Sequence, residues 1–254
     1  MNSITNNTWI QSLKDRAEYM MQNKKIEQTE YDCSICEDKG YLFDNEGAVS
    51  WCECKLKKDA QERLIKSGIS DRVKTNTFKN YKQDNDQRKD AVNTCLKYLS
   101  DFKEKYPSLI LMGEVGAGKT HLAIATANKL LSKYVVKYVL YEDIRALKFS
   151  LNDREHYNSV ISNLREVQVL FIDDLFKGLE KDIDASRAKA ELDVVYEIIN
   201  HRYNNKKPVL ITTELNINRM MQIDKAIASR ILEMCKGYRI NFDGIELNYR
   251  VFGD

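Results

Sequence analysis

The chain has 254 residues, of which 43% are hydrophobic and 31% are charged, a balance typical of a folded protein and unlike a disordered or collagen-like one. Its 40 Lys and Arg residues nearly cancel its 38 Asp and Glu residues, and a net charge of +2 excludes a global attraction to nucleic acid or to an anionic membrane. The first thirty residues hold no signal-peptide pattern, and no run of about 18 uncharged apolar residues occurs, so we expect a cytoplasmic protein without a membrane segment.

The length allows one full domain and a smaller module. We expect an N-terminal module over residues 1–58, a linker helix and connector over 59–80, and a main domain over 81–254. The first predicted element is an amphipathic helix within residues 9–27, where Ile10, Leu13 and Met20 recur at roughly helical spacing. Its apolar stripe packs either on the protein's own body or on a partner, and periodicity does not decide between them.

Four cysteines follow in a short segment that is too small to form a core by itself: Cys33, Cys36, Cys52 and Cys54. A CxxC pair and a CxC pair supply four thiolates, which is enough for a closed, structural zinc site. A thioredoxin-like redox pair is disfavoured because no βαβ pattern surrounds the segment, and buried unliganded cysteines are disfavoured because there is little core to hide them. The isolated Cys95 and Cys235 are expected to be small buried hydrophobes.

A basic stretch comes directly after the cysteines, with positive side chains at Lys55, Lys57, Lys58 and Arg63. Together with the aromatic residues Tyr41 and Trp51, these side chains would suit contact with a nucleic-acid backbone. A solvated helix face explains the same charges equally well, so both interpretations stay open.

From Ser108 onward, continuous apolar runs alternate with helical patterns. The apolar runs are LILM, VVKYVLY, VLFI and PVLITT, and the intervening helical segments include HLAIATANKLL and ELDVVYEIINHRY. Strands that are buried on both faces show continuous Val, Ile and Leu. The predicted fold is therefore α/β, with a parallel sheet flanked by helices and preceded by the small helical and zinc-binding module.

The segment GEVGAGKT, from Gly113 to Thr120, has the Walker A form and lies between a predicted strand and a predicted helix. Its glycines allow backbone N–H groups to converge on phosphate oxygens at the start of that helix. We expect Lys119 to reach the β and γ phosphates of ATP and the Thr120 hydroxyl to bind magnesium.

The strand VLFI ends in Asp173 and Asp174, which are placed to serve as the acidic partners of this loop. Asp173 is expected to hold magnesium, and Asp174 to orient or deprotonate the attacking water. After the next strand, Thr213 or Glu214 is the candidate sensor of the γ-phosphate. Arg230, on a later helix, is the candidate arginine finger for a neighbouring subunit.

These motifs resemble those of the DnaC/DnaI-type helicase loaders of bacteria and phages over most of the chain. The resemblance rests on the four-cysteine module, SGISDRVKTNTFKNY, LMGEVGAGKTHLA, VLFIDDL, IINHRYNNKKPVLITT and ASRILEMC. It implies a P-loop AAA+ ATPase that assembles with its own copies, binds single-stranded DNA and places a replicative DNA helicase on it. The N-terminal module would contact the helicase.

Carried over by position, the resemblance implies ATP, magnesium and zinc as cofactors. The implied nucleotide-binding residues are Gly113, Glu114, Val115, Gly116, Ala117, Gly118, Lys119, Thr120, His121, Asp173 and Thr213. The implied catalytic residues are Lys119, Asp173, Asp174 and Arg230. Where relatives often have TSN, this chain has Thr212, Thr213 and Glu214, a departure at the sensor position.

Two alternative functions fit the same motifs. A transposition helper ATPase of the IstB type shares the core, and an ATP-gated binding adaptor with little hydrolysis fits the short Asp174 and the unusual Glu214. Phe78 and Tyr81 precede the core where the family often lines the adenine pocket, although ordinary packing explains them as well.

Overall fold

The computed structural model describes residue 15 and residues 31–43, 49–69, 72–150, 153–179 and 185–252. The amphipathic helix expected within 9–27 lies outside these residues except for Asp15, which is helical. The chain divides into two compact units, Met1–Lys55 and Leu56–Asp254. No helix among the described residues is long and apolar enough to cross a membrane.

The smaller unit contains a β-hairpin in which β1 (Tyr41–Phe43) pairs with β2 (Val49–Trp51) in antiparallel register. Gly40 accepts a hydrogen bond from the Cys52 amide, which fixes the hairpin against the cysteine-bearing turn. Helix α2 (Glu53–Ser67) begins at the end of this unit and continues into the larger one.

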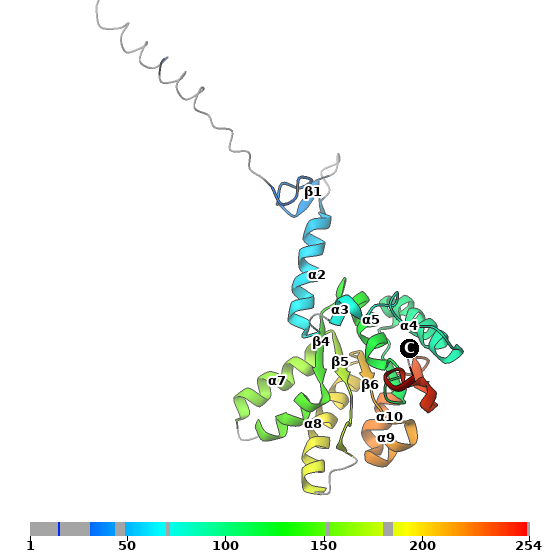
Figure 1. Ribbon diagram of the computed structural model, residues 1–254. Helices are drawn as coiled ribbons and strands as arrows, with labels where there is room; N and C mark the ends of the chain where they lie inside the picture. The colour runs from blue at the N-terminus through cyan, green and yellow to red at the C-terminus, as the bar shows by residue number, and fades with distance from the viewer. Residues whose placement is uncertain are drawn as a thin grey trace, which may run out of the picture. The chain divides into compact units, whose positions relative to one another are not determined.

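The larger unit is built on a parallel sheet of five strands in the order β4-β5-β6-β3-β7 (Figure 1). The strands are β3 (Leu109–Gly113), β4 (Val136–Leu140), β5 (Val169–Asp173), β6 (Val209–Thr212) and β7 (Arg239–Phe242). All four neighbouring pairs are parallel, which confirms the α/β fold with a parallel sheet flanked by helices. The edge strand β7 is not among the predicted strands, because its alternating buried and exposed residues lack the continuous apolar run of a central strand.

Helices cover both faces of this sheet and connect its strands. They are α3 (Arg72–Thr75), α4 (Asp86–Lys105), α5 (Lys119–Leu131), α6 (Tyr141–Ala146), α7 (Arg154–Glu166), α8 (Ala185–Asn204), α9 (Ile217–Ile223), α10 (Lys225–Met234) and α11 (Tyr249–Phe252), with single 3-10 turns η1 (Leu147–Ser150) and η3 (Ile245–Leu247). Alternate residues of β3 enter two separate cores. Leu109 and Leu111 pack with α4 and α5, whereas Ile110 and Met112 pack with α6, α8 and α10.

Candidate functional site

The loop between β3 and α5 bends sharply through glycines in the left-handed backbone region. A Cβ atom on Gly113, at φ 101°, would overlap the carbonyl oxygen of Phe242 in the neighbouring strand. A Cβ atom on Gly118, at φ 92°, would lie 2.7 Å from the ring of Tyr81. Only glycine fits these positions without moving the backbone, which explains the predicted loop in steric terms.

This loop lines a cavity of about 450 Å³ at the carboxyl ends of the strands. Among the described residues, the cavity lining contains six Lys or Arg residues, three carboxylates, and the loop and helix positions from Val115 to His121. The excess of positive charge and the N-terminus of α5 suit a nucleotide polyphosphate. The predicted residues Gly113 and Glu114 are not among the lining residues, but their carbonyl oxygens accept hydrogen bonds from Lys119, which does line the cavity.

Lys119 is buried at the start of α5, and its ammonium group donates hydrogen bonds to the carbonyl oxygens of Gly113 at 2.8 Å and Glu114 at 2.7 Å. Burial lowers the pKa of this lysine, while nearby carboxylates such as Glu214 oppose that shift. The ammonium therefore lies within the loop itself, close to where phosphate oxygens would enter.

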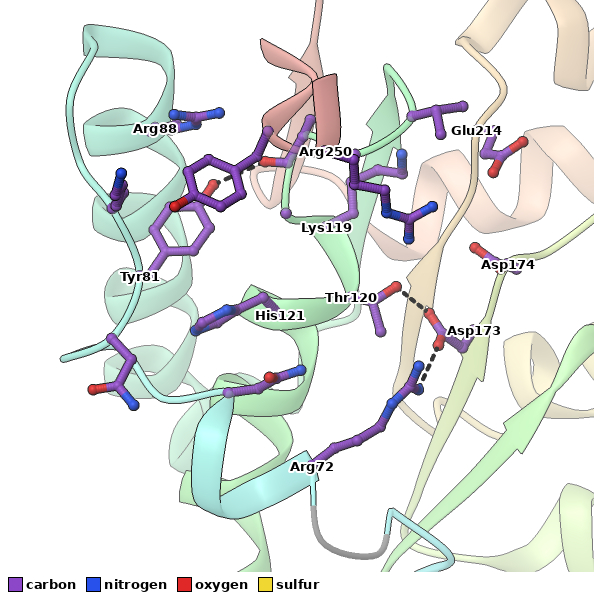
Figure 2. A pocket seen from close by; sticks show the side chains of 18 of the residues that line it. Arg72, Tyr81, Arg88, Lys119, Thr120, His121, Asp173, Asp174, Glu214 and Arg250 are labelled. Atoms are coloured by element: carbon purple, nitrogen blue, oxygen red, sulfur yellow. Dashed lines mark hydrogen bonds and ion pairs between the residues drawn. The ribbon is translucent and has the colours of Figure 1, made fainter. Parts of the chain in front are cut away.

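Two predicted magnesium residues meet at the end of β5. The Thr120 hydroxyl donates to Asp173 Oδ1 at 2.9 Å (Figure 2). The Thr212 hydroxyl donates to the same oxygen at 2.5 Å. Asp173 is buried, and its oxygen ligands are of the hard type that magnesium prefers. The residues present therefore fit a magnesium ion held between Thr120 and Asp173.

Asp174 lies at the same edge of the sheet and faces the cavity, but its carboxylate is already paired. The Lys177 ammonium is 2.6 Å from Asp174 Oδ2 and 3.7 Å from Glu214 Oε1. The hydrogen bond that Lys177 donates to the Asp174 carboxylate raises the pKa of Lys177. Lys177 therefore forms ion pairs with both carboxylates, a role that its place in a polar turn does not reveal from sequence.

The prediction that Thr213 faces the nucleotide does not match the geometry. Its side chain is fully buried, and its hydroxyl donates to the Leu175 carbonyl at 2.7 Å instead of lining the cavity. The adjacent Glu214 does line the cavity. Because successive residues leave a strand in opposite directions, only one of this pair reaches the site.

The far side of the cavity is formed by residues that precede the loop in the chain (Figure 2). Tyr81 donates its hydroxyl to the Ala117 carbonyl at 3.2 Å and contacts the His121 ring edge-on, at 5.3 Å between centroids. His121 is bonded through a ring nitrogen to the Thr77 carbonyl at 2.8 Å. Tyr81 therefore lies at the site, whereas Phe78 packs against the core of the unit.

Arg72 and Tyr138 belong to the site although sequence reasoning did not select them. Tyr138 donates its hydroxyl to Asp173 Oδ2 at 3.0 Å, and Arg72 Nη1 lies 3.8 Å from the same oxygen. Arg72 lies within the phrase SGISDRVKTNTFKNY and Tyr138 within an apolar run, but neither pattern indicates that the side chain reaches Asp173.

Arg230 lies outside the cavity of its own chain. Its guanidinium donates to Asn200 Oδ1 at 3.0 Å and to the Ala226 carbonyl at 2.9 Å, and it lies 5.1 Å from the centroid of the Tyr196 ring. A contact between Arg230 and a nucleotide therefore requires the site of another copy of the chain.

The four predicted zinc ligands come together in the smaller unit. Their sulfur atoms all lie within 4.8 Å of one another, with 3.8 Å between Cys33 and Cys52 and 3.3 Å between Cys36 and Cys54. Neighbouring sulfurs of a tetrahedral zinc site with bonds of about 2.3 Å lie about 3.8 Å apart. The Cys36 thiol beside it raises the pKa of Cys54 to about 12, whereas backbone hydrogen bonds at Cys36 and Ile35 lower the pKa of Cys33 to about 7. A cation bound among the sulfurs would favour the thiolate form of all four cysteines.

The four cysteines are expected to bind about one zinc ion per chain, measured by elemental analysis of the purified protein. Cys36→Ser should lose most of this zinc and destabilise the smaller unit, because three thiolates leave the site open. Cys95→Ala is the control, since Cys95 lies in the core of the larger unit. Full zinc content in Cys36→Ser would contradict this assignment.

Comparison with known proteins places these features in a family. The family model described as IstB-like ATP binding protein matches residues 29–247. The phage-like element PBSX protein XkdC of Bacillus subtilis is 32% identical over 88% of this chain and 87% of its own length. The replicative helicase loader DnaC of Escherichia coli K12 is 26% identical over 68% of each chain. The crystal structure of the DnaC helicase loader superimposes on 68% of this chain with a TM-score of 0.57 at 23% identity, a likeness of fold.

Proposed function

Because the chain belongs to the family of IstB-like ATP-binding proteins, we propose that it is an AAA+ ATPase that delivers a replicative DNA helicase onto single-stranded DNA. The observation that carries this proposal is the similarity of about two thirds of the chain to a replicative helicase loader, DnaC. The additional four-cysteine unit supports a loader over a transposition helper, which shares the core. We also propose that the chain is organised as an N-terminal module over 1–58, a linker over 59–80 and an ATPase core over 81–254.

In this proposal the loop from Gly113 to Thr120 binds the phosphates of ATP, and His121 follows it in α5. Lys119 would turn from the loop carbonyls to the β and γ phosphates, exchanging two neutral acceptors for charged ones. Magnesium, held by Thr120 and Asp173, would neutralise phosphate charge. Tyr81 would bound the base or ribose side of the nucleotide.

Asp174 is proposed to accept the proton of the attacking water. Its carboxylate must first part from the Lys177 ammonium, because a carboxylate in a 2.6 Å ion pair is a poor acceptor. Glu214, rather than Thr213, is positioned to sense the γ-phosphate. Slow basal hydrolysis that a partner or DNA accelerates is consistent with these contacts.

Arg230 is proposed to act on the nucleotide of a neighbouring copy, which requires self-association through the larger unit. Its present partners, Asn200 and the Ala226 carbonyl, hold the side chain on the surface of α8 and α10. Arg230→Ala in the assembled protein should therefore lower ATP turnover, and full turnover in that variant would contradict this role.

The smaller unit is proposed to contact the helicase through one face of its hairpin. Tyr41 pairs with Trp51 across the strands, and Phe43 lies two residues from Tyr41, so the three rings share one face. Phe43 is 66% exposed and Trp51 is 65% exposed. The described part of this unit has more acidic than basic side chains, which favours a protein surface over a nucleic-acid backbone. The acidic residues are Asp15, Asp32, Glu37, Asp38 and Glu53, against Lys39 and Lys55.

The proposal predicts a stable complex with the replicative helicase of the host, measured by light scattering with and without ATP. Lys119→Ala should remove the dependence on ATP, because the lysine is the main phosphate cation of the loop. Trp51→Ala should weaken the complex about tenfold or more, as expected for a central aromatic contact. Phe149→Ala, an exposed aromatic residue of the larger unit, is the control. Absence of a complex under every nucleotide condition would contradict the loader function.

A transposition helper remains the second candidate, because the matching family model carries the IstB description. It predicts that a transposase, and not a helicase, is retained by the ATP-bound chain in the same light-scattering measurement.

A further inference from the structure

Arg72 contacts the proposed magnesium residue from an element that lies outside the nucleotide-binding motifs. Its Nη1 atom donates a hydrogen bond to the Tyr138 hydroxyl at 3.1 Å and lies 3.8 Å from Asp173 Oδ2. Tyr138 in turn donates to the same Asp173 oxygen at 3.0 Å. Figure 2 shows the guanidinium pointing at one side of the carboxylate while Thr120 approaches the other. Helix α3 is thus fastened to the end of β5 both directly and through a tyrosine.

The charge balance at Asp173 explains why this contact forms. The Asp173 side chain is only 3% exposed, and a buried carboxylate is costly without a nearby positive charge. Its Oδ1 atom receives neutral hydroxyl donors from Thr120 and Thr212. The ammonium of Lys119 is bonded to two loop carbonyls instead. Among the described residues, Arg72 is therefore the cation recorded within ion-pair distance of this carboxylate.

A magnesium ion beside Thr120 would supply the same compensation with twice the charge. Two cations on one small carboxylate repel each other, and the magnesium ion is anchored additionally by phosphate oxygens. Arg72 is 53% exposed and has solvent to turn into, whereas Asp173 has no alternative position in the core. The arginine is the group that can move.

We propose that Arg72 competes with magnesium for Asp173, so that binding of magnesium-ATP releases Arg72 and loosens helix α3. This inference rests on the proposed function only in taking Asp173 as the magnesium residue. Arg72 thereby acts as a positioning residue that reports occupancy of the site to the segment before the core. Helix α2, which contains the cluster residue Cys54, ends at Ser67, a few residues before Arg72.

The competition is measured by titrating magnesium into the protein with a fluorescent ATP analogue. Arg72→Gln is expected to lower the magnesium concentration at half-saturation about two- to fivefold, the range of a partly exposed ion pair. Arg72→Lys keeps the charge and should stay close to the wild-type value. Lys79→Gln, an exposed residue that does not line the cavity, makes the same charge change as a control. An unchanged or higher half-saturation concentration in Arg72→Gln would overturn the proposal.

Release of α3 is measured separately by amide hydrogen exchange over residues 72–75. Magnesium-ATP should speed exchange there in the wild-type chain, and Arg72→Gln should exchange fast with or without nucleotide. Val73 is buried in the core, so the expected change is local loosening and not unfolding. Slower exchange of α3 on binding magnesium-ATP would show that Arg72 supports the ion instead of competing with it.

Neither measurement uses a helicase, so its outcome is separate from that of the loader function. If Arg72 competes with magnesium but no helicase complex forms, the inference about Arg72 holds and only the proposed helicase partner is wrong. If a helicase complex forms but Arg72→Gln leaves the magnesium affinity unchanged, the loader function holds and the inference about Arg72 is wrong.

Discussion

Replacing Asp174 by asparagine should lower ATP turnover about 100-fold or more while leaving nucleotide affinity within about twofold of the wild-type value. Asparagine keeps the size of the side chain and the backbone hydrogen bond from the Asp174 amide to the Thr212 hydroxyl, at 2.9 Å. It loses the ability to accept a proton from water. Multiple-turnover assays with helicase and single-stranded DNA, together with equilibrium binding of a fluorescent nucleotide, separate the two quantities.

Asp90→Asn is the matched control for this substitution, because Asp90 is exposed on α4 and does not line the cavity. A variant at Asp174 that retains more than about a tenth of the turnover would remove this carboxylate from the role of general base. A wild-type chain without measurable turnover under any of these conditions would instead favour the ATP-gated adaptor.

Replacing Arg202 by alanine should lower the free energy of unfolding by about 3 kcal/mol or more, because several buried carbonyl oxygens lose hydrogen bonds from a charged donor, each worth about 1.5 to 3 kcal/mol. The guanidinium is fully buried and donates to carbonyl oxygens at the end of α7 and the starts of β5 and β6. Its acceptors are Leu164, Arg165, Val167, Gln168 and Pro208, at distances from 2.7 to 3.3 Å. Without the side chain, these carbonyls lose the guanidinium as donor, and of the five only the Pro208 carbonyl has a recorded backbone donor among the described residues, the Leu170 amide.

Arg202 remains charged at neutral pH even though burial lowers its pKa to about 10. Denaturant unfolding of the zinc-loaded chain measures the loss. Arg202→Lys should fall between wild type and Arg202→Ala, because one ammonium cannot reach both sets of carbonyls. Arg154→Ala, at the exposed start of α7, is the control. A loss below about 1 kcal/mol in Arg202→Ala would mean that water replaces the guanidinium at little cost.

Arg202 also explains part of the pattern on which the family resemblance rests. In the phrase IINHRYNNKKPVLITT, the arginine joins α8 to the start of β6, and the Lys207 ammonium donates to the Glu166 carbonyl at the end of α7. The phrase therefore reflects how two helices and two strands are tied together at the end of the sheet opposite the nucleotide site.

The sequence alone determined the features whose chemistry is encoded locally. The strands β3 to β6 follow from continuous apolar runs, and the loop from Gly113 to Thr120 follows from a contiguous motif whose glycines are required sterically. The four-cysteine cluster follows from two short spacings in a segment without a core. In each case the residues that act together are close in the chain, or the residue type mainly has one structural role, as continuous apolar residues do in buried strands.

Only the tertiary structure decided which distant side chains reach the site. Arg72, Tyr138 and Thr212 converge on Asp173 because β4 and β6 flank β5 and α3 lies at its end, an order that periodicity does not specify. The structure also turned Thr213 inward and left Glu214 in the cavity. A polar residue in a linker or at a strand end has the same local pattern whether it faces solvent or a carboxylate. Whether such a residue faces solvent or a carboxylate is decided by the packing of the sheet, which depends on contacts throughout the domain.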